Sequence, residues 1–127
     1  MRALRTALGI AVAGGLGSLA RYGLGTFITR RHPGEFPWGT FAVNVLGAFA
    51  MGLIFTLATE KWQLAPWLRL SLTVGFLGGF TTFSTMAFEG YRLSADDLPG
   101  LTALYLVGSI ALGLVAVYGG ILTARAL

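Results

Sequence analysis

The chain has 127 residues, of which 55% are hydrophobic and 11% charged, with 19 glycines, no cysteine and a formal net charge of +4. A soluble domain contains about 25% charged residues, so this composition excludes a soluble domain beside the apolar segments. The lack of cysteine excludes disulfides and thiolate metal sites. The basic residues are spaced at the ends of apolar runs, which argues against nucleic-acid binding. We expect one membrane domain covering residues 1–127.

Four apolar runs are long enough to cross a bilayer. They cover residues 4–29, 38–59, 67–91 and 100–124. At about 1.5 Å per residue in a helix, each run exceeds the ~30 Å hydrocarbon layer. Tryptophans lie at the ends of runs, where an interfacial aromatic belt would place them: Trp38, Trp62 and Trp67. The sequence therefore predicts an all-α integral membrane protein with four transmembrane helices.

Asn44 is the only strongly polar residue within the second run. An amide at membrane depth is costly unless it is hydrogen-bonded. Two roles fit such a residue: it bonds one helix to another, or its N–H groups are donors to an anion on a transport path. The second run alone does not distinguish these roles.

The third run has an unusual middle, Gly-Gly-Phe-Thr-Thr-Phe-Ser-Thr at 78–85. A glycine pair followed by hydroxyl residues weakens a helix, so we expect the third helix to be broken near the bilayer midplane. Carbonyls freed by such a break are suitable ligands for a hard cation such as Na⁺. A kink satisfied by the Ser and Thr hydroxyls is the alternative. Phe83 lies in this stretch, and the positive edge of its ring can face an anion, although most membrane phenylalanines simply pack.

Basic residues in short loops normally fix the orientation of a membrane protein. With four spans, one side of the membrane holds Arg2, Arg5, Lys61, Arg69 and Arg125. The other side holds Arg30, Arg31 and Arg92, together with Arg21 if that side chain extends toward it. This five-to-four division gives almost no bias. Either folding decides a weakly encoded orientation, or copies insert both ways and pair antiparallel.

Four short spans enclose little space, so we expect an oligomer rather than a monomer that surrounds a pathway. Small residues spaced by four permit close helix contacts and support this expectation. They are Gly9, Ala13 and Gly17 in the first run, and Ala48 and Gly52 in the second.

No catalytic constellation is present in the sequence. Of the five carboxylates, only Glu89 falls within an apolar run, and no Ser/His/Asp set, metal cluster or phosphate-binding loop can be assembled. We do not expect an enzyme.

Three motifs are distinctive in combination. They are the 78–85 stretch, Gly39-Thr40-Phe41-x-x-Asn44-x-x-Gly47 at the start of the second run, and Gly-Ser-Leu-Ala-Arg-Tyr at 17–22. Together they closely resemble the bacterial CrcB/Fluc family of fluoride channels, and the resemblance covers nearly the whole chain in length, span number and motif order. It implies a multi-pass protein of the bacterial cytoplasmic (inner) membrane that exports fluoride by passive conduction.

The resemblance also implies an antiparallel homodimer of dual topology, with two fluoride pores at the subunit interface. A structural Na⁺ on the two-fold axis would be held by the backbone carbonyls of Gly78 and Thr81. Asn44 and Phe83 match the pore asparagine and the first pore phenylalanine. Matching polar or acidic positions along the path are Thr40, Ser84, Thr85, Glu89, Tyr105 and Ser109. Arg21, the basic residue farthest from the ends of a run, is expected at a vestibule or interface.

One position departs from the family pattern. The second pore phenylalanine, three residues after the first, is Met86 in this chain. Methionine fills a similar volume, but its thioether is flexible and lacks the positive edge of a ring. Phe80 and Phe88 lie nearby but out of register. We expect the aromatic half of the anion site to differ here from the family pattern.

Two other classes of protein share some of these features. A small multidrug-type exporter also has four spans and dual topology, but it needs an ionisable carboxylate within its first span, and residues 4–29 contain none. A membrane assembly subunit without transport activity would not explain the broken third helix with its hydroxyl run. The preferred interpretation is a channel whose partners are fluoride, the lipid bilayer and a second copy of itself.

Overall fold

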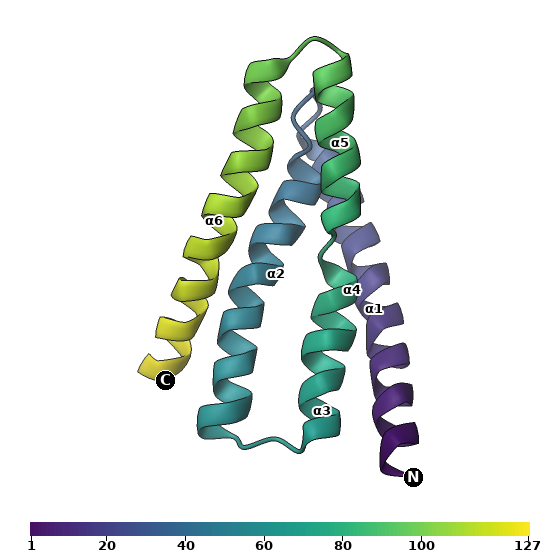
Figure 1. Ribbon diagram of the computed structural model, residues 1–127, viewed down its shortest axis with the longest axis vertical. Coiled ribbons are helices and arrows are strands. Elements are labelled where there is room, and N and C mark those ends of the chain that lie inside the picture. Colours follow the sequence, from purple (N-terminus) through teal and green to yellow (C-terminus); the bar gives the residue numbers. More distant parts are fainter.

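The computed structural model describes residues 1–127 as a bundle of helices without strands (Figure 1). The elements are α1 (Arg2–Arg31), α2 (Trp38–Thr56), the π-helix η1 (Leu57–Lys61), α3 (Pro66–Leu70), the π-helix η2 (Ser71–Leu77), α4 (Gly78–Phe80), α5 (Phe83–Ala95) and α6 (Pro99–Ala126). They form four helical stretches that are long and apolar enough to cross a membrane, and the third is interrupted. The predicted all-α class with four spans and a broken third helix is confirmed.

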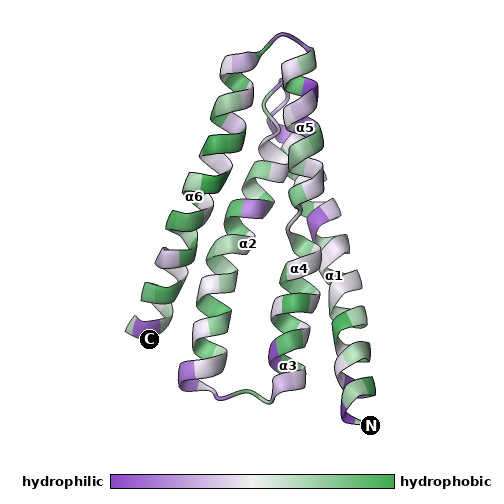
Figure 2. Ribbon diagram, viewed as in Figure 1, coloured by the Kyte–Doolittle hydropathy of each residue, from purple (hydrophilic) through white to green (hydrophobic).

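The two ends of the bundle differ in the chain segments they hold. Both termini and the turn between η1 and α3 lie at one end, and the turns after α1 and after α5 lie at the other (Figure 1). Proline occupies the first turn of α3 and of α6, where its missing N–H costs no helical hydrogen bond. Apolar residues cover most of the helix lengths, and strongly hydrophilic ones gather toward the ends, apart from isolated hydrophilic turns within α1 and α2 (Figure 2). The arrangement is that of an up-and-down membrane bundle.

Glycines bring the helices into backbone contact. A Cβ at Gly120 of α6 would overlap the Phe49 carbonyl oxygen and lie 2.7 Å from Leu53 N, and one at Gly52 of α2 would overlap the Val117 carbonyl oxygen. A Cβ at Gly17 of α1 would likewise overlap the carbonyl oxygen of Phe76. The small residues that we expected to support an oligomer, Gly9, Ala13, Gly17 and Gly52, therefore pack within one chain.

Substituting Gly120 with Ala should destabilise the bundle, because the added methyl meets backbone that cannot move aside. Small-to-large changes of this kind cost about 1–3 kcal/mol. Gly113→Ala is the matched control on the same helix, since a Cβ there meets nothing within 4 Å. Thermal unfolding of both variants in detergent should show a lower midpoint for Gly120→Ala alone. Equal midpoints would contradict the close α2–α6 packing.

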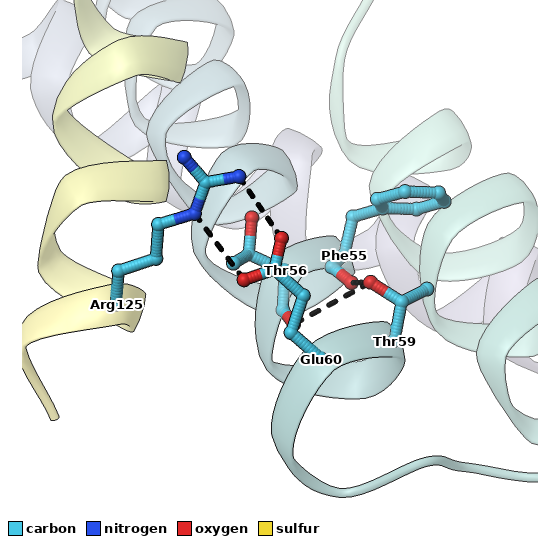
Figure 3. A network of polar contacts seen from close by, with 5 residues as sticks. All are labelled: Phe55, Thr56, Thr59, Glu60 and Arg125. Atoms are coloured by element: carbon cyan, nitrogen blue, oxygen red, sulfur yellow. Dashed lines mark hydrogen bonds and ion pairs between the residues drawn. The ribbon is translucent and has the colours of Figure 1, made fainter.

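The end that holds both chain termini carries an internal charge cluster (Figure 3). Arg125 Nη2 donates to Glu60 Oε1 at 2.9 Å, and Arg125 Nε donates to Glu60 Oε2 at 3.2 Å. Lys61 Nζ donates to the Leu127 carbonyl oxygen at 2.6 Å. These contacts join the end of the second span to the end of α6.

Candidate functional site

The third span breaks at Thr81 and Thr82, whose backbones are extended. The Thr82 N–H donates to Asn44 Oδ1 at 2.8 Å rather than to the Gly78 carbonyl, its partner in a continuous helix. Asn44 Nδ2 donates in turn to the Thr82 carbonyl at 3.0 Å. The Asn44 amide thus bonds both backbone groups of Thr82 and holds the break against α2. One N–H of Nδ2 has no partner within the chain.

Helix α5 restarts with a side-chain cap. Thr82 is its N-cap residue, and Thr82 Oγ1 accepts a hydrogen bond from Thr85 N at 3.2 Å. This cap draws the Thr85 N–H away from the Thr81 carbonyl. The carbonyls of Gly78 and Thr81 therefore both lack the N–H donor that a continuous helix would supply, and Gly78 is exposed on the surface of the chain.

The break lies within the 78–85 stretch, as expected, and falls on its hydroxyl pair rather than on its glycine pair. Gly78 and Gly79 are helical, and the interruption comes at the hydroxyl pair that follows. Glycine is required at position 79, because its backbone lies against the Gly14 carbonyl of α1 and a Cβ would overlap that carbonyl. The threonines open instead because Asn44 and the Thr82 cap replace the helical hydrogen bonds.

Arg21 is tied to the same region. Its Nε donates to the Gly79 carbonyl at 3.0 Å, so a guanidinium from α1 lies at the end of α4. Arg21 also lines a cavity of about 360 Å³ between α1 and α2. The polar residues that line it are Arg21, Arg30, Thr26, Thr29, Thr40 and Thr82. This cavity is therefore basic and rich in hydroxyls.

A second cavity, of about 330 Å³, opens at the break itself. Its lining includes Asn44, Gly47, Thr81, Thr82, Phe83 and Met86. The two residues that would form the aromatic part of a pore differ sharply in burial. The Phe83 side chain is 76% exposed on the outside of the bundle, whereas Met86 is 7% exposed in the cluster with Leu93 and Tyr105.

A third polar group lies between the break and the end of the bundle that holds the turns after α1 and after α5. Thr40 Oγ1 donates to Glu89 Oε1 at 2.6 Å, and both residues line a cavity of about 440 Å³. Nearby on α6, the Tyr105 hydroxyl and Ser109 Oγ are buried without any partner. Buried polar atoms are nearly always satisfied, so these two hydroxyls have hydrogen-bonding capacity that the chain itself does not use.

The predicted site residues are thus divided among three places. The break joins Asn44, Thr81, Phe83 and Met86, while Thr40 and Glu89 pair nearer the loops, and Tyr105 and Ser109 lie inside the bundle. Ser84 is exposed and lines neither of the two cavities nearest the break. Sequence reasoning missed Thr82, whose indication was a threonine, a preferred N-cap residue, directly before the restarted helix. It also missed Thr26, Thr29 and Arg30.

Met86→Phe tests the unusual position directly. The resemblance to fluoride channels implies that fluoride flux is preserved or raised, because the cavity beside Met86 gives space for a ring that restores the family pattern. Size-exclusion profiles and liposome fluoride efflux, measured beside the parent, check this expectation. A monodisperse variant with much slower efflux would mean that the ring overpacks the cluster around Met86.

These features define a class: a four-span membrane protein whose third span is broken at mid-depth and bonded to the second span by an asparagine. The family model for "CrcB-like protein, Camphor Resistance (CrcB)" matches residues 8–121, and the chain belongs to this family. The chain is 51% identical over 116 residues to a "Fluoride-specific ion channel FluC" of Solibacter usitatus, covering 91% of this chain and 95% of the relative. A protein of the same name from Geobacter sulfurreducens is 46% identical over 124 residues, covering 98% of this chain and 100% of the relative.

Proposed function

We propose that this chain forms a fluoride-specific channel that lets the ion leave the cytoplasm passively through the bacterial inner membrane. Relatives with that name align with this chain over 95% and 100% of their own length. The observation that carries the proposal is the break itself: an amide, hydroxyls and a ring are gathered at mid-span beside an open cavity. The chain is not an enzyme.

Neutral donors suit this task. Fluoride is small and strongly hydrated, so a pore must replace its water with several short donors. A fixed ammonium would hold the ion too tightly to release it. The free N–H of Asn44, the unpartnered hydroxyls of Tyr105 and Ser109, and the exposed ring of Phe83 meet this need. Thr40, Ser84, Thr85 and Glu89 complete the proposed path, and Arg21 with its basic cavity forms the vestibule.

The surface at the break supports a homodimer. Irregular backbone does not face lipid, because each unsatisfied polar group in hydrocarbon costs several kcal/mol. Here Gly78 and the ring of Phe83 are exposed beside the extended Thr81–Thr82 backbone. A second copy would cover this surface and close the cavity at the break into a path. We propose an antiparallel pair, with two pores between the copies.

The carbonyls at the break fit a structural Na⁺. Those of Gly78 and Thr81 lack their helical donors, and backbone carbonyls are suitable ligands for a hard cation. Two copies that meet at their breaks would contribute both carbonyls each. The bound cation would supply the positive charge that these oxygen dipoles require, and Asn44 would keep the break open to present them.

The two rival classes fit less well. Helix α1 contains no acidic residue, so the carboxylate that couples a multidrug-type exporter to protons is missing from the first span. An assembly subunit would leave the unpartnered hydroxyls inside the bundle unexplained.

Dual topology follows from the balanced basic residues and has its own test. Tags at either end should be accessible from both sides of the membrane in intact cells, in comparable amounts. Adding three lysines to the η1–α3 turn should bias the population to one orientation and reduce flux. A single orientation of all unmodified copies would contradict the antiparallel pair.

A further inference from the structure

The folded chain is strongly polarised in charge, although its basic residues are nearly balanced between the two ends. Four of the five carboxylates lie toward the end that carries the turns after α1 and after α5: Glu35, Glu89, Asp96 and Asp97. They outnumber the three arginines at that end, Arg30, Arg31 and Arg92, and leave a formal charge of about −1. We call this the acidic end. Arg21, which the sequence count placed on this side, is left out of the sum because its guanidinium lies at mid-span against the Gly79 carbonyl.

The opposite end holds five basic side chains and one carboxylate, a formal charge of about +4. We call this the basic end. Its only carboxylate, Glu60, is already engaged with Arg125 of the same chain. Arg2, Arg5 and Arg69 pair with no carboxylate, and the Arg5 guanidinium lies 5.3 Å from the centre of the Trp67 ring. Their charge is therefore available to a partner.

We propose that this polarity selects the antiparallel arrangement of two copies, an inference that rests on the proposed dimer. In an antiparallel pair, each membrane face brings the basic end of one copy beside the acidic end of the other. In a parallel pair, two ends of about +4 would lie side by side on one face. The acidic residues would thus set how inserted copies pair, whereas the basic residues alone set how each copy inserts, because Asp and Glu contribute little to insertion.

The Asp96–Asp97 turn is the place to test this proposal. Asp97 has a left-handed backbone with φ of 58°, a conformation that Asn also tolerates, and both aspartates are exposed. Asp96→Asn/Asp97→Asn therefore removes two negative charges without straining the turn or altering the count of basic residues. The control is Glu60→Gln, which also removes a negative charge but at the basic end, where the proposal predicts no loss of pairing.

The measurement is the dimer fraction of purified full-length protein in liposomes of zwitterionic lipid, by single-molecule photobleaching at increasing lipid dilution. At low salt, the double variant should dimerise about three- to tenfold more weakly than the parent, and Glu60→Gln as tightly as the parent or more so. At about 1 M salt, where the screening length falls to ~3 Å, parent and double variant should converge.

Two outcomes would overturn the proposal: a double variant that dimerises like the parent at low salt, or a Glu60→Gln variant weakened as much as the double variant. Both leave the proposed function standing if the parent is dimeric and passes fluoride. A parent that is monomeric at every dilution would instead contradict the proposed dimer.

Discussion

Asn44→Asp should reduce fluoride flux by about two to three orders of magnitude while the protein remains dimeric. The carboxylate keeps the acceptor for Thr82 N but loses both the N–H that bonds the Thr82 carbonyl and the free N–H offered to the ion. A like charge about 4 Å from the anion costs about 4 kcal/mol at an effective dielectric constant of 20. The variant should therefore block conduction through electrostatics more than through misfolding.

Gln63→Glu is the matched control for this substitution. It makes the same amide-to-acid change at the only other amide side chain in the sequence, in an exposed turn far from the break. Liposome efflux should be unchanged for Gln63→Glu, and size exclusion should show dimers for both variants. Full activity of dimeric Asn44→Asp would remove Asn44 from the path.

Depleting sodium should dissociate the dimer and abolish flux. Without a cation, the free carbonyls of Gly78 and Thr81 from both copies would face one another unpaired, and each unsatisfied buried group is costly. Protein purified with N-methyl-D-glucamine in place of sodium should lose dimers on size exclusion, and added Na⁺ should restore them.

A tightly held sodium ion can survive purification without sodium in the buffer. The sodium content of each preparation is therefore measured by elemental analysis. We expect one sodium per two chains in the active preparation. Dimers with full flux and sodium content well below that ratio would contradict the cation site. Choline added instead of Na⁺ is the control for ionic strength.

The sequence predicted the architecture well because apolar length and a polar interruption are local properties. Four runs became four helices, and the third is broken within the 78–85 stretch. The position of the break could not be read locally, because it depends on Asn44, which is 38 residues from Thr82. Composition marked the stretch as a whole, and the bonds from Asn44 fix the break at its two threonines.

The sequence predicted which residues belong to the site better than how their side chains are arranged. Asn44 had been left between a helix-bonding role and an anion-donor role, and its amide makes the first kind of contact while one N–H stays free. Spacing could not show that Met86 turns into the bundle while Phe83 faces outward, since both lie on one short helix. Nor could spacing show that Gly9, Gly17 and Gly52 make contacts inside one chain.

Fluoride efflux from liposomes that contain only the purified protein tests the central claim most directly. Vesicles loaded with fluoride should release it rapidly once a potassium ionophore balances the charge. Vesicles with Asn44→Asp, and vesicles loaded with chloride in place of fluoride, should release little. The account predicts rapid, fluoride-selective efflux from the parent protein. No efflux above that of protein-free vesicles, from protein shown to be a folded dimer, would contradict it.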